Sequence, residues 1–287
     1  MDKATQGWMN GFLGMLIFAG SLPATRLAVA GFSPTFLTCA RASIAGIVAL
    51  LLLLALRQKR PARGDLRAFA LVALGVVVGY PLLSALALQH ISSARSIVVL
   101  GLLPLATAVF GVMRGDARPR AGFWLFSGLG SACIAGFAAS GGATGSWRGD
   151  LLMLAAIALC AVGYTEGAKL TRRFGGWQVI CWGLVLALPL MATLMLLAAP
   201  STFDQVATSA WLGLGYVSLF SMLIGFIFWY RGLALGGIAA VSQLQLLQPF
   251  FGLSLAAWLL DETIHPGMLT ASVAAMFCLA GAKRFAN

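Results

Sequence analysis

The stretch Ala94-Arg-Ser-Ile-Val-Val-Leu-Gly-Leu-Leu-Pro104 has a counterpart 145 residues later, Ala239-Ala-Val-Ser-Gln-Leu-Gln-Leu-Leu-Gln-Pro249. The two stretches share their first alanine, a leucine near the end and the final proline. The same offset continues without a gap through identical residues: Asp116 and Asp261, Gly122 and Gly267, Ser127 and Ser272, and Cys133 and Cys278. The second half of the chain is therefore a copy of the first.

Hydropathy divides each copy into five apolar stretches. Hydrophobic residues make up 60% of the chain, charged residues make up 9%, and the mean hydropathy is +0.94. A soluble domain carries about 25% charged residues, and a bilayer core needs about 20 apolar residues per helix. We expect ten transmembrane helices, at residues 8–30, 36–56, 66–88, 92–113, 122–139, 149–170, 177–198, 210–232, 238–260 and 266–282.

Five crossings in the first copy force the second copy to enter the bilayer in the opposite direction. The sequence therefore predicts an all-α integral membrane protein of ten transmembrane helices, built as two inverted five-helix repeats around a central cavity. We place the first repeat at residues 1–140, the second at 149–287, and a connector of small residues at 141–148. Two bundles joined in this way can tilt and open one site to either side in turn.

The net charge of +11 is distributed unevenly between the two ends of the predicted helices. With the N-terminus in the cytoplasm, 15 of the 19 lysines and arginines fall inside, and four fall outside: Arg26, Arg41, Arg95 and Arg148. Cytoplasmic loops of membrane proteins are enriched in these residues. We predict a multi-pass protein of the cell inner (plasma) membrane with both termini in the cytoplasm, in contact with lipid and not with nucleic acid.

Sequence motifs of catalysis, nucleotide binding and metal binding, such as HExxH or a P-loop, do not occur. The five cysteines lie inside predicted spans and lack metal-ligand spacing. We predict no enzyme, no catalytic residue, no cofactor and no metal. An integral membrane enzyme is the remote alternative, which facing acids or histidines at one interface would reveal. The oligomeric state stays open, a monomer included, because the small-residue spacings Gly7/Gly11 and Gly75/Gly79 suit packing within one chain or in a dimer.

Polar and aromatic side chains at membrane depth are candidates for the cavity wall, because such groups are costly in lipid. Outside the ninth span these candidates are Tyr80, Ser84, Tyr164, Ser218, Ser221 and Trp229. On a regular α-helix, Ser218, Ser221 and Trp229 share one face. The alternative is close helix packing through small residues, or an interfacial position for Tyr80.

The ninth span is the most polar. Ser242, Gln245 and Gln248 occupy one arc of about 120° on an α-helix, while Gln243 projects toward a neighbouring helix. An amide both donates and accepts hydrogen bonds, which suits a neutral or zwitterionic solute. The alternative is hydrogen bonding between helices.

Four prolines inside spans are candidate hinges or gates: Pro23, Pro81, Pro104 and Pro249. A proline removes a backbone hydrogen bond and kinks a helix. Pro104 and Pro249 are equivalent in the repeat, so that kink occurs twice with opposite sense. The alternative is static bending that serves packing.

Two charged residues inside spans have open roles. Glu166 is the one carboxylate well inside a span, and we expect Lys169 and Arg173 of the same helix to neutralise it. Arg41 has two possible roles, either pairing with a structural partner or binding a carboxylate.

Several segments together resemble a known family. Pro34 precedes Cys39-Ala-Arg41 in the second span, the sixth opens with Gly149-Asp-Leu-Leu152, and the ninth carries Gln248-Pro249 before Ala257-Trp-Leu259 and Glu262. In this order they resemble the drug/metabolite transporter superfamily, in its duplicated ten-helix (EamA-type) branch, and within it the YddG-type exporters of aromatic amino acids. Ala117 replaces the glutamate usual in the first copy, and the tryptophan common in the first span is missing.

The resemblance implies one central cavity shared by both halves and transport by alternating access. The absence of a carboxylate midway through a span argues against organic cations as solutes, and the absence of a midplane titratable group favours a facilitator or exchanger. We predict a secondary transporter that exports small amphipathic solutes, namely amino acids including aromatic and apolar ones. The alternative is a carrier of nucleotide sugars or other anionic metabolites, with Arg41 and Arg95 as the anion-binding residues.

Overall fold

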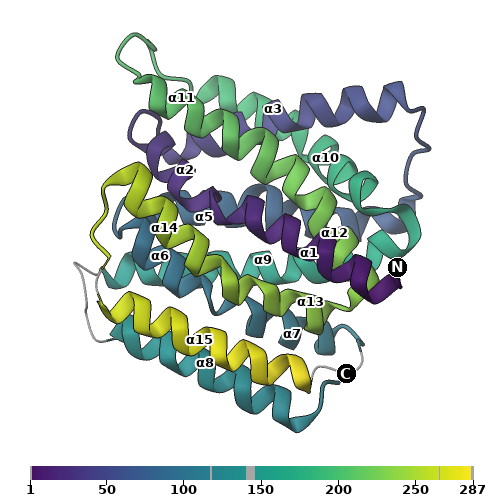
Figure 1. The fold of residues 1–287 in the computed structure, drawn as a ribbon. Coiled ribbons are helices and arrows are strands. Elements are labelled where there is room, and N and C mark those ends of the chain that lie inside the picture. Colours follow the sequence, from purple (N-terminus) through teal and green to yellow (C-terminus); the bar gives the residue numbers. More distant parts are fainter. Residues whose placement is uncertain (1, 117, 140–145, 265, 286–287) are drawn as a thin grey trace.

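The computed structural model describes residues 2–116, 118–139, 146–264 and 266–285, and every regular element in these ranges is helical (Figure 1). The first repeat contains α1 (Lys3–Ala19), α2 (Ser21–Val29), α3 (Pro34–Ala55), η1 (Arg63–Asp65), α4 (Leu66–Val72), η2 (Ala73–Gly79), α5 (Tyr80–Ala87), α6 (Ser93–Leu100), α7 (Leu103–Met113) and α8 (Ala121–Ala139). The second contains α9 (Trp147–Phe174), α10 (Gly176–Leu197), α11 (Thr208–Gly215), η3 (Tyr216–Ile224), α12 (Gly225–Gly236), α13 (Ile238–Ser242), η4 (Gln243–Leu247), α14 (Gln248–Leu260) and α15 (Pro266–Arg284).

These elements combine into rods of membrane-spanning size. Within the described ranges, eight are long and apolar enough to cross a bilayer: Lys3–Val29, Pro34–Ala55, Arg63–Ala87, Ser93–Met113, Trp147–Phe174, Gly176–Leu197, Thr208–Gly236 and Ile238–Leu260. The remaining two rods, α8 and α15, contain shorter apolar stretches. Each of the ten predicted spans falls on one of these rods, so the predicted ten-helix membrane fold is confirmed.

Contacts between equivalent helices show that the two copies run in opposite directions. The backbone N–H of Arg120, at the start of α8, donates to the carbonyl of Phe285, just after the end of α15, at 3.2 Å. Glu262, which follows α14, accepts hydrogen bonds from the backbone N–H groups of Ser93 and Ala94 at the start of α6. Figure 1 shows α8 and α15 side by side, with both chain termini at the same end of the bundle. The repeats are inverted, as five spans per copy require.

Five of the rods are interrupted near their middle. The interruption is a break at Gly20 between α1 and α2, a π-helical segment in η2 and in η3, a turn between α6 and α7, and a 3₁₀ segment in η4. Pro81, Pro104 and Pro249 lie in the first turn of the helix that resumes, and Pro23 follows Gly20 closely. A proline removes one backbone N–H donor and bends a helix, so it is accommodated where the regular helix is already interrupted.

The two π segments occupy corresponding places in the third and eighth rods, η2 in the first repeat and η3 in the second. π geometry is uncommon and is frequently found at functional sites. The duplication therefore conserves a local irregularity as well as the helix order. Because a π segment changes the phase of the side chains, the α-helical face predicted for Ser218, Ser221 and Trp229 does not form.

Glycines allow two pairs of rods to approach closely. A Cβ on Gly7 would lie 2.4 Å from the backbone N of Gly236, and one on Gly232 would lie 2.6 Å from that of Gly11. Gly75 contacts α9 in the same way, with the carbonyl oxygen of Leu159 at 2.6 Å from a built Cβ. Both predicted small-residue spacings thus pack helices within one chain.

Charged groups near the helix ends pair between elements. Glu166 of α9 forms a salt bridge with Arg114, which follows α7, and this hydrogen bond raises the pKa of Arg114. Lys169 donates to the carbonyl of Arg114, and Arg173 pairs with Asp65 at 2.6 Å. The predicted neutralisation of Glu166 within its own helix is therefore wrong, because the end of α7 approaches α9 and brings a cation from outside it.

Candidate functional site

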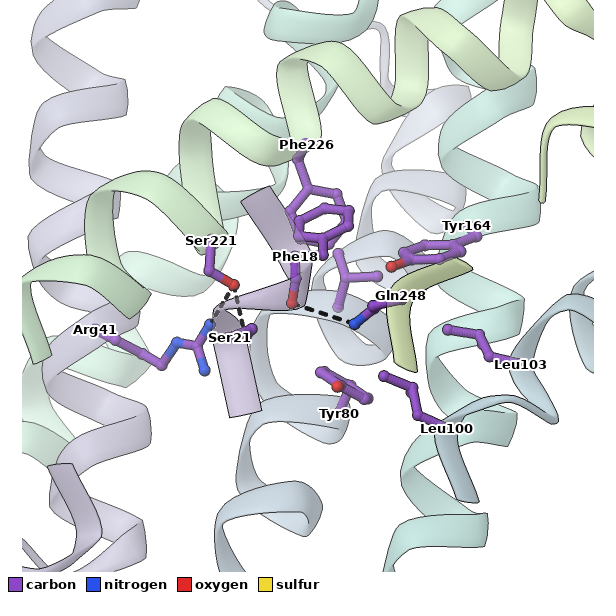
Figure 2. Close-up of a pocket in the computed structure, with 11 residues that line it drawn as sticks. Phe18, Ser21, Arg41, Tyr80, Leu100, Leu103, Tyr164, Ser221, Phe226 and Gln248 are labelled. Carbon is purple, nitrogen blue, oxygen red and sulfur yellow. Dashed lines mark hydrogen bonds between the residues drawn. The ribbon is translucent and has the colours of Figure 1, made fainter. Parts of the chain in front are cut away.

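The candidate site is a cavity in the middle of the bundle, lined by residues from both repeats (Figure 2). Its wall consists of Phe18, Ser21, Arg41, Val76, Tyr80, Leu100, Leu103, Tyr164, Ser221, Phe226 and Gln248. All of these except Arg41 and Tyr164 lie in or next to one of the five helix interruptions. The broken helices therefore converge on one point, as they do around the solute sites of transporters built from inverted repeats.

The cavity is nearly closed in this conformation. The space open to the centre of a water molecule amounts to about 20 Å³, which is room for about one water. A larger cleft of about 870 Å³ on the same measure lies elsewhere, with Lys3, Arg172, Trp177 and Arg231 in its wall. An organic solute can enter the central cavity only after the surrounding helices move.

One side of the cavity is polar and cationic. Ser21 Oγ and Ser221 Oγ lie 2.9 Å apart and share a hydrogen bond. Arg41 Nη2 donates to Ser221 Oγ at 3.4 Å, whereas its Nε is buried without a hydrogen-bond partner. Figure 2 shows the guanidinium directed at the two serines. This corner joins α2, α3 and η3.

The other side combines amides with aromatic rings. Gln248 Nε2 donates to the carbonyl of Phe18 at 3.2 Å, and Gln245 Nε2 donates to the hydroxyl of Tyr164 at 3.1 Å. The Tyr164 ring stacks on Phe18 and packs at an angle against Phe226. The side-chain oxygens of Gln245 and Gln248 are buried and lack partners. This side offers apolar surface and unused hydrogen-bond acceptors together.

Four of the nine predicted binding residues line the cavity: Tyr80, Tyr164, Ser221 and Gln248. Of the other five, Gln245 and Trp229 lie just behind the wall. Gln245 holds the Tyr164 hydroxyl, and the Trp229 ring packs against Tyr164 and Phe18. The 3₁₀ segment η4 places Gln245 and Gln248 on the same side, because residues three apart align in that geometry.

The remaining three predicted residues do not line the cavity. Ser84, Ser218 and Ser242 each donate to a carbonyl of the preceding turn in their own helix, those of Pro81, Leu214 and Ala239. Such bonds satisfy a hydroxyl locally and remove the need for a polar neighbour.

Six wall residues were not predicted: Phe18, Ser21, Val76, Leu100, Leu103 and Phe226. Arg41, also in the wall, was predicted only as an alternative, from the signal of a charged residue within a span. Ser21 carried a weaker one, since it lies beside Pro23. The apolar residues gave none, because they do not differ from the lipid-facing majority of the chain.

An all-helical membrane bundle of inverted repeats, with a buried site where broken helices meet, is the architecture of a secondary transporter. The chain belongs to the EamA-like transporter family, whose pattern matches residues 5–138 and 147–282. It is therefore a membrane transporter of that family. It is 59% identical, over the full length of both chains, to the protein named "Uncharacterized transporter YdeK" of Bacillus subtilis (strain 168).

The fold also matches a solved structure titled "Crystal structure of protein". The TM-score is 0.75 with 19% sequence identity, and the match covers 98% of each chain. This likeness supports the fold alone.

Proposed function

We propose that the protein exports small amphipathic solutes, namely amino acids with aromatic or apolar side chains, by alternating access. The observation that carries this proposal is the composition of the central cavity. Tyr164, Phe18 and Phe226 offer apolar contact on one side, and Arg41 and Ser221 offer polar contact on the other. A solute with one apolar and one charged end matches both sides.

We place the protein in the inner membrane, with both chain termini on the cytoplasmic side. This orientation puts 15 of the 19 basic residues inside, as the positive-inside rule favours. The two repeats, residues 1–140 and 149–287, are the units that move. Pro23, Pro81, Pro104 and Pro249 act as the hinges, because each lies where a rod is already interrupted.

The competing proposal, a carrier of nucleotide sugars or other multiply charged anions, needs more than one free cation in the cavity. Arg95 does not supply a second cation, because its guanidinium donates two hydrogen bonds to Asp150, at 2.9 and 2.8 Å. Arg26 donates to the carbonyl of Leu88 and does not line the cavity. Arg41 remains, which suits a singly charged group.

Exchange of labelled solutes across liposomes containing the purified protein tests this proposal. We expect counterflow of phenylalanine and leucine, and none of a nucleotide sugar. Because the wall residues of the cavity include no acid or histidine, we expect the same flux with and without a pH gradient. The proposal fails if no member of a broad amino-acid panel moves, or if the nucleotide sugar moves instead.

The matched variants for that assay are Tyr164→Ala and Trp258→Ala. Tyr164 is buried in the cavity wall, whereas Trp258 is 78% exposed on α14. Both substitutions remove one large aromatic ring. The first should lower phenylalanine flux by about tenfold or more, the loss expected when a bound ring loses its contacts, and the second should leave it unchanged.

A further inference from the structure

Among the residues that the structure describes, Arg41 is a buried ion without a counterion. Its side chain lies on α3, seven residues into a membrane-spanning helix, and is 3% exposed. Of its five N–H donors, one makes a long hydrogen bond to Ser221, and the Nε is buried and unpaired. No carboxylate in the described ranges forms a salt bridge with it.

The other buried charged side chains, Arg95 and Glu166, each have a counterion. Arg95 pairs with Asp150, and Glu166 pairs with Arg114. An unpaired buried charge is strongly unfavourable, more so than a buried pair. Retaining one at the wall of the cavity is understandable if the missing anion arrives with the solute.

The second repeat has no arginine at the position equivalent to Arg41. The helices α3 and α10 are both 22 residues long and begin at Pro34 and Gly176, so Arg41 corresponds to Gly183. Gly183 brings no charge to the opposite side. A single guanidinium balances one negative charge, and its planar fork matches the two oxygens of a carboxylate.

We propose that Arg41, together with the hydroxyls of Ser21 and Ser221, forms a subsite for one carboxylate group, and that the cavity selects solutes carrying such a group. This inference rests on the proposed transport function and narrows its substrate class. Entry of the carboxylate gives the guanidinium its missing partner and adds hydroxyl donors to the second oxygen. An amide or amine of the same size leaves Arg41 uncompensated and is rejected.

Thermal unfolding of the detergent-purified protein provides the test, because a ligand that binds the folded state raises the Tm. The probes are phenylalanine, 3-phenylpropionate, phenylalaninamide and phenethylamine. We expect the two carboxylates to raise the Tm, and the amide and the amine to have no effect at equal concentration. Chloride and sulfate are added separately, and stabilisation by these anions equal to that by the carboxylates would overturn the assignment.

The variants are Arg41→Gln, Arg41→Lys and, as the matched control, Arg148→Gln. Arg148 is an exposed arginine that stacks on Trp147. We expect Arg41→Gln to weaken binding of both carboxylates by about tenfold or more, and Arg41→Lys to retain part of the affinity, since a lysine keeps the charge but loses the fork. Arg148→Gln should bind like the original protein.

If Arg41→Gln fails to fold, the comparison of acid with amide on the unmodified protein and on Arg41→Lys decides the question. Equal stabilisation by phenylalanine and phenylalaninamide would overturn the subsite while leaving amino-acid transport intact. Stabilisation by 3-phenylpropionate without any by amino acids would support the subsite and overturn the proposed amino-acid function.

Discussion

At the scale of single residues, Tyr164 connects the apolar and polar parts of the cavity. Its ring lies against Phe18, Phe226 and Trp229, and its hydroxyl accepts a hydrogen bond from Gln245. The residue comes from α9, one of the two wall helices without an interruption. In the proposed transport cycle, Tyr164 provides a surface on an uninterrupted helix against which the broken helices move.

Replacing Tyr164 with phenylalanine keeps the ring and removes the hydroxyl. The buried amide of Gln245 then loses its acceptor, a change that costs about 1–3 kcal/mol. We expect a lower Tm together with a weaker apparent affinity for phenylalanine in the exchange assay. The alanine variant should lose more affinity than the phenylalanine variant, and equal affinities would show that the ring does not contact the solute.

Sequence reasoning could find the residues whose chemistry is unusual for lipid, and little else at this scale. Tyr164, Gln248 and Ser221 were found because polar groups are costly at depth. Ser84 and Ser218 are also polar groups at membrane depth, but they do not line the cavity, and each donates a hydrogen bond within its own helix. The sequence indicated that Arg41 is a charged residue within a span, but it could not show whether a counterion lies nearby, because that depends on which helices face Arg41.

At the scale of elements, the first rod is held against the eighth through glycines. α1 and α12 approach so closely that Gly232 has the backbone of Gly11 where a side chain would be. Phe18 and Trp229 also meet across this pair, edge to face, next to the cavity. Since α1 belongs to the first repeat and α12 to the second, this interface joins the two repeats.

A Gly232→Ala substitution should destabilise the protein. Its Cβ would lie 2.6 Å from the backbone N of Gly11, where no side chain can yield, and overpacking of this kind costs about 1–3 kcal/mol. We expect a lower Tm in detergent. Gly128→Ala on α8 is the control, because no atom lies within 4 Å of its built Cβ; an equal loss there would refute the packing explanation.

The helices were predictable because length and hydropathy define a membrane span. The interruptions were predictable in part. Pro81, Pro104 and Pro249 indicated irregular helix geometry around their own positions. The π geometry of η2 and η3 depends on tertiary packing and leaves no pattern in hydropathy. The predicted face of Ser218, Ser221 and Trp229 does not form for this reason. Of the predicted arc of Ser242, Gln245 and Gln248, the two glutamines lie on the same side, because 3₁₀ geometry keeps residues three apart aligned.

At the scale of the whole molecule, the inverted duplication and the central cavity belong together. The antiparallel contacts of α8 with α15 and of α6 with α14 place equivalent segments at opposite ends of the bundle. A tilt that opens one end therefore has a counterpart that opens the other. The symmetry is incomplete inside the cavity, where Arg41 faces the site from the first repeat alone.

The most direct test of alternating access uses a single cysteine in the cavity wall. Ser221→Cys is introduced after Cys39, Cys133, Cys160, Cys181 and Cys278 have been replaced, and a membrane-impermeant maleimide is added to right-side-out and to inside-out vesicles. We predict slow labelling from each side, since the cavity is nearly closed, and slower labelling from both when phenylalanine is present. Labelling from one side only, or at a rate that the solute does not change, would contradict a site that opens to both sides of the membrane.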